Sequence, residues 1–102
     1  MLTVLFEYRA RPGSEEEFER LYGPGGEWAR FFAPADGYLG TELHRNLADP
    51  TRYFLIDRWR SNGDFERFAS RHAAEYAERS RQAEALYDEE ARLGRFVTVD
   101  GP

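Results

Sequence analysis

Residues 53–68 most constrain the fold, because the hydrophobic spacing changes there from that of a strand to that of a helix. The first part is rich in aromatic and branched residues on both parities, which predicts a strand covered on both faces. Ser61 stands at the N-cap position of the helix that follows, and Asp64 favours its first turn. The apolar positions at helical spacing are Phe65, Phe68, Ala69, His72, Ala73, Tyr76 and Ala77.

Composition limits the classes to which the protein can belong. The 102 residues fit a single domain spanning residues 1–102, and 16% of them are aromatic. The net charge of −5 argues against a nucleic-acid partner, since sequence-independent binding needs a basic surface. The absence of cysteine excludes disulfides and thiolate metal sites. We find no signal peptide and no membrane-spanning run, so we expect a cytoplasmic protein without a membrane partner.

The other elements are punctuated by recognisable start and stop signals. Ser14 and Glu17 form a capping-box pattern, and Pro34 ends a short helix. The last helix is expected to run or bend as far as Arg92, with Gly94 as its C′ residue. Strands are thus predicted at residues 2–10, 38–46, 53–59 and 95–99, and helices at 15–22, 27–33 and 62–92.

The element order is β-α-β-β-α-β, which is typical of the split βαβ, ferredoxin-like arrangement. It predicts an α+β fold with an antiparallel four-stranded sheet and helices on one face. The strands nevertheless carry apolar residues on both parities, so something must cover the second face. A second copy of the chain is the simplest cover, which predicts a homodimer with facing sheets.

Candidate functional residues stand at isolated positions, because the sequence has no phosphate loop, metalloprotease motif or nucleophile elbow. Trp59 is either a core ring or a pocket residue whose indole N–H holds a substrate. Both histidines titrate near neutrality. His72 lies on an apolar helix stripe, whereas His44 shares a strand face with Glu42. Two histidines without ligand spacing predict no metal site.

Two charged positions have competing interpretations. Glu90 falls on the apolar stripe of the predicted last helix, where a buried carboxylate needs a partner. Arg58, Arg79 or Arg95 is expected to supply that partner in a structural ion pair. Arg79 also suits a functional role, because its guanidinium fork is able to bind an acidic or phenolate substrate.

Several segments have a characteristic order and spacing: Gly37–Leu43, Arg52–Ser61, Phe65–Phe68, His72, Tyr76 and Glu90–Phe96. As a set they resemble the antibiotic biosynthesis monooxygenase (ABM) domain family, over about residues 2–99. The resemblance implies a dimeric α+β barrel. It also implies enzymes that oxidise phenols, anthrones or quinols with O₂, often without a metal or flavin.

The resemblance further implies a cofactor-free mechanism in which a base takes a phenolic proton and the substrate anion itself reduces O₂. Trp59 matches the family's strand-end Trp and would hold the substrate, His44 would be the base, and Arg79 would stabilise anionic oxygen. No cofactor is expected, and the partner is a small aromatic substrate. The substrate-binding wall would consist of Tyr38, Phe65, Phe68, His72 and Tyr76.

Two departures from the family pattern favour a second function. Leu55 and Phe65 stand where characterised oxygenases carry Asn and Tyr, which favours a non-catalytic small-ligand-binding or scaffold dimer. Haem-degrading members of the family use a first-strand Asn, a helix Trp and a His beyond it. Tyr8 and Phe68 hold the first two positions here, and His72 lies too early for the third. Haem degradation is therefore disfavoured.

Overall fold

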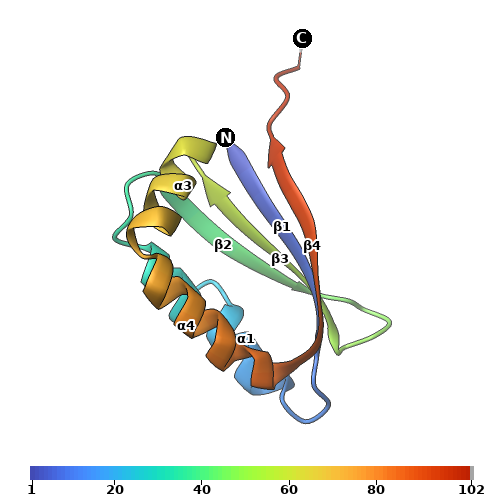
Figure 1. The fold of residues 1–102 in the computed structure, drawn as a ribbon. Coiled ribbons are helices and arrows are strands. Elements are labelled where there is room, and N and C mark those ends of the chain that lie inside the picture. The colour runs from blue at the N-terminus through green and yellow to red at the C-terminus, as the bar shows by residue number, and fades with distance from the viewer. Residues whose placement is uncertain (102) are drawn as a thin grey trace.

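The computed structural model describes residues 1–101 and contains a four-stranded antiparallel sheet (Figure 1). The first and third strands of the chain lie at its centre, as in a ferredoxin-like α+β fold, which confirms the predicted fold class. The strands are β1 (Leu2–Ala10), β2 (Tyr38–Arg45), β3 (Arg52–Trp59) and β4 (Tyr87–Val97), in the spatial order β2-β3-β1-β4.

The helices pack on one face of this sheet (Figure 1). Buried side chains from the sheet and the helices form one core that is dominated by aromatic rings. None of the helices in residues 1–101 is long and apolar enough to cross a membrane. The helices are α1 (Glu15–Tyr22), α2 (Glu27–Phe32), α3 (Asn62–Arg71), α4 (Ala73–Ala83) and the short 3-10 helix η1 (Glu84–Leu86).

The strand register divides the sheet into a helix face and an outer face. Leu55 pairs with Phe6, and the next residue, Ile56, pairs with Leu5. Alternate residues of a strand point to opposite faces, so buried Leu55 faces the helices and Ile56 faces outward. No part of residues 1–101 covers the outer face, which leaves large rings in solvent there. These rings belong to Phe54, 47% exposed, and Phe96, 50% exposed.

The predicted helix caps have different outcomes. Ser61 Oγ accepts a hydrogen bond from the Asp64 backbone N–H at 3.1 Å, which confirms the N-cap of α3. α1 begins directly after Ser14, as predicted, but the Ser14 side chain makes no capping hydrogen bond. The capping-box contact is therefore wrong. The helix start rests instead on the backbone, where the Phe18 N–H donates to the Ser14 carbonyl at 2.8 Å.

The prediction of a last helix through Arg92 is wrong. The chain leaves helical geometry at His72, with φ −113° and ψ 28°, and α4 ends at Ala83. Residues 87–92 form the first half of β4, which is longer than the short strand predicted at 95–99. Their pairing satisfies backbone groups along β1, and this tertiary gain outweighs the helical spacing of the sequence.

Gly94 is consequently not a helix cap. It lies inside β4 with φ +130°, next to the point where the β1–β4 register shifts. A bulge of this kind needs a residue that tolerates positive φ, which explains a glycine at this position. The bulge keeps Arg92 and Arg95 on the helix face, opposite Phe6 and Val4 respectively.

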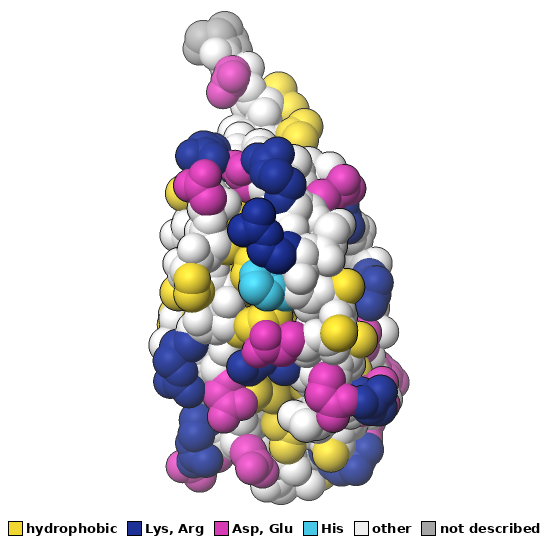
Figure 2. Space-filling model, turned by 60° about the vertical axis from the view of Figure 1, so that its left-hand side comes forward, with side chains coloured by type: hydrophobic (Ala, Val, Ile, Leu, Met, Phe, Trp, Pro, Cys, Tyr) yellow, Lys and Arg dark blue, Asp and Glu magenta, His cyan; other side chains and the backbone are white. Residues whose placement is uncertain are grey.

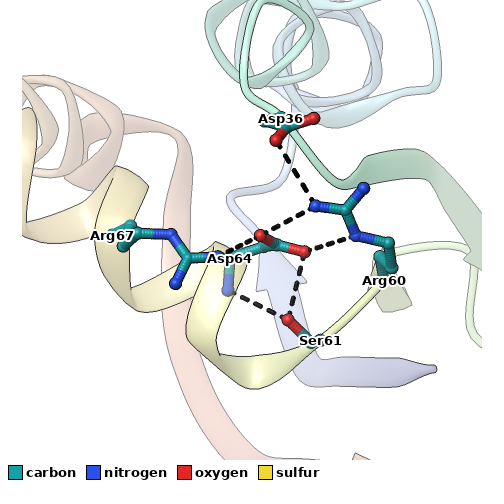
Figure 3. Close-up of polar contacts among 5 residues, drawn as sticks. All are labelled: Asp36, Arg60, Ser61, Asp64 and Arg67. Atoms are coloured by element: carbon teal, nitrogen blue, oxygen red, sulfur yellow. Dashed lines mark hydrogen bonds and ion pairs between the residues drawn. The ribbon is translucent and has the colours of Figure 1, made fainter.

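Asp64 ties the end of β3 to the start of α3 (Figure 3). Its carboxylate accepts hydrogen bonds from Arg60 Nε at 2.8 Å and Ser61 Oγ at 3.0 Å, and it also pairs with Arg67. Arg60 is the main reason that the pKa of Asp64 falls to about 2. The Arg60 backbone N–H also donates to the Gly37 carbonyl at 2.7 Å, so this cluster holds the β2 end of the sheet against α3.

The surface on the helix side carries charges of both signs. Figure 2 shows acidic and basic side chains interleaved there, with hydrophobic side chains visible between them. This mixture accounts for a net charge of only −5 from 14 basic and 19 acidic residues.

Candidate functional site

A cavity of about 740 Å³ lies between the sheet and the helices. Strands β1, β3 and β4 supply one wall, and residues of α1, α2, α3 and α4 supply the other. Rings and aliphatic groups share the lining with charged and polar side chains, which are Asp57, Ser80, Arg81, Glu84, Glu90, Arg92 and Arg95. Its apolar lining includes Val4, Phe6, Tyr22, Trp28, Phe32, Leu55, Phe65 and Tyr76.

Asp57 places a carboxylate in the β3 wall of this cavity. The side chain is buried, with 7% of the residue exposed, and Oδ1 accepts a hydrogen bond from Thr41 Oγ1 at 2.6 Å. Burial raises the pKa of Asp57 to about 6, and the Thr41 hydrogen bond opposes that rise. A carboxylate with such a pKa is mostly ionised at neutral pH and is a stronger base than an ordinary aspartate.

Thr41 in turn contacts Tyr38 at the start of β2. The Tyr38 hydroxyl lies 2.5 Å from Thr41 Oγ1, and its ring packs edge-on against Trp59 with 5.3 Å between ring centroids. Three residues therefore form a hydrogen-bonded chain, which we call the hydroxyl chain: Tyr38, Thr41 and Asp57.

The helix wall adds the hydroxyl of Tyr76 from α4. Its pKa rises to about 12, chiefly because of burial and then because of the Asp57 charge, so the phenol stays protonated. Tyr8 also lines the cavity, and its hydroxyl donates to Glu90 at 2.7 Å. The partner of Glu90 is thus a tyrosine on β1, and the predicted arginine partner is wrong.

β4 contributes two cations to the cavity lining, Arg92 and Arg95. Arg95 is held by Asn62 and Glu66, each at 3.0 Å, and its guanidinium lies 4.7 Å from the Phe65 ring centroid. Arg92 and Arg95 stand on the same sheet face as Asp57, and Arg95 bridges β4 to α3.

Trp59 does not line this cavity. It is fully buried at the end of β3, and its indole N–H has no acceptor within residues 1–101. Its ring packs against Phe32 and Phe65, with centroids 5.5 and 5.3 Å away, and both of these rings do reach the cavity. Trp59 therefore forms the layer behind the wall.

The predicted wall residues separate into two groups. Phe65 and Tyr76 line the cavity as expected, whereas Tyr38 belongs to the hydroxyl chain. Phe68 packs behind the wall, 5.5 Å from Phe32 between centroids. His72 stacks on Phe68 with centroids 4.6 Å apart and lines a separate, smaller depression beside residues 34–36.

The structure does not bring His44 or Arg79 to the cavity. His44 pairs with Phe54 on the outer face, and its Nε2 lies 3.1 Å from Glu42 Oε1. Arg79 points away along α4, where it contacts Glu75 at 3.2 Å and lies 4.6 Å from the Phe31 ring centroid. Neither side chain shares a wall with Trp59 or Asp57.

Asp57 and Thr41 are the polar groups that the sequence interpretation left out of the site. A signal was present, since Asp57 has the same strand parity as Leu55 and Trp59, two residues that were expected to be buried. An acidic residue between buried positions of a strand indicates a satisfied or functional carboxylate. Thr41 carried no comparable signal, because threonine is common on strands.

Comparison with known proteins places this architecture in a family. The family model for antibiotic biosynthesis monooxygenase matches residues 1–85. The chain belongs to the antibiotic biosynthesis monooxygenase family. No curated protein sequence matches it. Within residues 1–101 of this ABM chain, no group of three His, Cys, Asp or Glu side chains is placed to hold a metal ion.

Solved structures share the fold. PA3566 from Pseudomonas aeruginosa is 25% identical, with a TM-score of 0.67, over 97% of this ABM chain and 94% of that chain. SnoaB from Streptomyces nogalater, described as a cofactor-independent oxygenase, is 19% identical with a TM-score of 0.71, over 98% and 94%. A mutant of MhuD, with two manganese protoporphyrin IX molecules bound per active site, is 22% identical with a TM-score of 0.72, over 100% and 99%.

Proposed function

We propose that this protein is a cofactor-independent monooxygenase that oxidises a phenolic, anthrone-like or quinol substrate with O₂. The observation that supports this most is the position of Asp57 in an aromatic cavity. Its carboxylate is buried, and burial raises its pKa to about 6. The cavity volume of about 740 Å³ suits a ligand of several fused rings. Membership of the ABM family and the fold shared with SnoaB agree with the same chemistry.

The proposed reaction starts with proton transfer. The substrate O–H bond breaks, and its proton moves to the Asp57 carboxylate, which leaves an electron-rich phenolate in the cavity. That anion passes an electron to O₂, and the resulting radical pair forms a C–O bond at a ring C–H carbon para to the original oxygen. The peroxide oxygen takes back the proton held by Asp57. The C–H and O–O bonds then break, so that water leaves and a carbonyl remains. One oxygen atom enters the product and the other leaves as water, so no further reductant is needed.

The surrounding groups suit the charges that develop. Arg92 and Arg95 give positive charge for the peroxide and phenolate oxygens, and the protonated Tyr76 hydroxyl is a hydrogen-bond donor in the same cavity. In this proposal Asp57 takes the role of base that the sequence suggested for His44, and Arg92 takes the role suggested for Arg79.

A second candidate function is non-catalytic binding of a small aromatic ligand. Leu55 and Phe65 favour it, because both line the cavity with apolar surface where oxygenases of the family were expected to carry polar groups. Haem fits the lining less well. No histidine lines the cavity within residues 1–101, so the residues present offer no imidazole to a haem iron.

We also propose that two copies associate through the outer face of the sheet. Leu5, Phe54, Ile56 and Phe96 place apolar surface there, beside the ion pairs of Arg52 with Glu7 and of Arg58 with Glu42. Pairing two outer faces would bury this surface and complete the dimeric barrel expected of the family.

Oxygen uptake by metal-stripped protein tests the proposed function. The panel contains hydroquinones, anthrones and naphthols, with quinone absorbance followed in parallel. Asp57→Asn is compared with His44→Gln, which alters the outer-face histidine. We expect uptake that is lost in Asp57→Asn and kept in His44→Gln. Loss in His44→Gln alone would restore His44 as the base.

The same panel separates the two candidate functions. Titration calorimetry with each compound measures binding without turnover. Binding that depends on the cavity, with no oxygen uptake above background for any compound, would contradict the oxygenase proposal and support the ligand-binding one.

A further inference from the structure

We propose that Thr41 and Tyr38 are positioning residues for Asp57: they hold Oδ1 so that Oδ2 meets the substrate hydroxyl, and they keep the carboxylate ionised near neutral pH. This inference rests on the proposed function, in which Asp57 is the base. It concerns the hydroxyl chain of Tyr38, Thr41 and Asp57, whose two hydrogen bonds measure 2.5 and 2.6 Å.

The number of protons fixes the direction of the chain. Each hydroxyl has one hydrogen, and an ionised carboxylate only accepts. Thr41 therefore uses its hydrogen on Asp57 Oδ1, and the Tyr38 hydroxyl must donate to Thr41 Oγ1. Two donors aligned toward one carboxylate strengthen each other. Asp57 Oδ2 accepts no hydrogen bond from residues 1–101 and remains available to a ligand in the cavity.

Of the groups around Asp57, Thr41 is the one that opposes the rise in the Asp57 pKa caused by burial. β1 presents Val4 as the pairing partner of Asp57, and the cavity-lining rings of α2 and α3 are apolar. α4 presents the Tyr76 hydroxyl, which stays protonated, and α4 and η1 also bring Arg81 and Glu84 to the cavity lining. β4 brings Glu90, Arg92 and Arg95 to the cavity, yet the pKa of Asp57 is set by burial and by Thr41. Removing the Thr41 hydroxyl therefore removes the opposition to burial.

Trp59 contributes to the outer end of the chain. Its buried ring packs edge-on against Tyr38, and Phe32 packs on the same tyrosine with 5.6 Å between centroids. These two rings restrict the phenol, so that its hydroxyl stays over Thr41. The strand-end Trp thereby acts on the proposed chemistry through Tyr38 and not through contact with the substrate.

Titration of Asp57 by NMR with ¹³C-labelled aspartate tests the inference without any substrate. We expect Thr41→Val to raise the Asp57 pKa by about one pH unit, the order expected for one lost hydrogen bond to a carboxylate. Thr41→Ser keeps a hydroxyl and should titrate like the wild type. Tyr38→Phe should raise the pKa by a smaller amount, because it removes only the second donor.

The acid limb of the oxygen-uptake profile gives a second readout. It should move to higher pH in Thr41→Val and stay in place in Thr41→Ser. An unchanged Asp57 pKa in Thr41→Val, or equal rises in Thr41→Val and Thr41→Ser, would overturn the inference. If Thr41→Val does not fold, the Tyr38→Phe titration decides in the same way.

Failure of this inference and failure of the proposed function are distinguishable. A preserved titration pattern with no oxygen uptake would contradict only the monooxygenase. Oxygen uptake by the wild type, together with an Asp57 pKa that is unchanged in Thr41→Val and Tyr38→Phe, would contradict only the positioning role.

Discussion

Replacing Asp57 with Asn should stabilise the fold at neutral pH while it removes the proposed base. Burial raises the pKa of Asp57 from its ordinary value of 3.8 to about 6, so the folded chain binds this proton more tightly than the unfolded chain. The difference of about two pH units corresponds to about 3 kcal/mol. This contribution to the free energy of unfolding of the wild type should therefore be complete only below the unfolded pKa and should fall by about 2 kcal/mol as the pH rises from about 4 to about 6.

Asn at this position does not titrate and still accepts the Thr41 hydrogen bond through its carbonyl oxygen. The difference in free energy of unfolding between Asp57→Asn and wild type should therefore grow by about 2.5 kcal/mol between pH 4 and pH 7.5. Urea denaturation at both pH values, followed by tryptophan fluorescence and far-UV circular dichroism, measures this difference. All other titrating groups contribute alike to both proteins and cancel.

A stability difference that is the same at pH 4 and pH 7.5 would refute this reasoning. It would mean that Asp57 titrates alike in the folded and unfolded chains, and the cavity would then lack a carboxylate tuned by burial. A variant that is more stable at neutral pH yet inactive would instead show that the buried charge serves function and lowers stability.

Three further predictions concern the glycine turns, the Asp64 cluster and the outer face. Gly37→Ala should destabilise the fold by about 2 kcal/mol or more, because φ is +90° and a Cβ would overlap the Asp64 carboxylate. Gly13→Ala is the control, since Gly13 has φ +89° but lies in open space, and it should cost about 1 kcal/mol in the same urea assay. Equal costs for the two variants would exclude the overlap. Asp64→Asn should lower the melting temperature at pH 7, because the ionised Asp64 stabilises the fold and its pKa is lowered there. The difference in melting temperature from wild type should shrink as the pH falls from about 4 through about 2. A difference that persists in full at pH 2 would contradict this role of the charge. Ile56→Lys should shift the chain from dimers to monomers in sedimentation velocity. Glu16→Lys, on the exposed surface of α1, should leave the dimer intact. A wild type that sediments as a monomer would contradict the proposed association.

The sequence predicted helices and strands correctly where hydrophobic spacing, capping residues and turn residues are enough to specify them. Residues 2–10, 27–33, 38–46 and 53–59 carry patterns that the structure reproduces within a residue or two, and Ser61 caps α3 as its sequence context predicts. The order of these elements then left few topologies, and the ferredoxin-like sheet follows from it. The resemblance to the ABM family was likewise available from the spacing of its residues.

The failures have a common physical cause. Residues 83–90 are spaced like a helix, yet residues 87–92 pair with β1, because the free edge of a central strand offers hydrogen bonds that no local pattern reveals. His44 and Arg79 have chemistry suited to a site, but strand parity and helix rotation direct both away from the cavity. Which face of a strand is buried depends on the partner layer and not on the strand alone.

The sequence by itself determined the element types outside residues 87–92, the fold class and the family, because hydrophobic period, caps and turn residues act over a few positions. Only the tertiary structure decided where the cavity lies and which polar groups reach it. Asp57 is an ordinary acid in the sequence. In the folded chain, burial raises its proton affinity, and the hydrogen bond from Thr41 on the neighbouring strand lowers it. Burial and hydrogen bonding are properties of neighbours in space, and they turn this carboxylate into a candidate base.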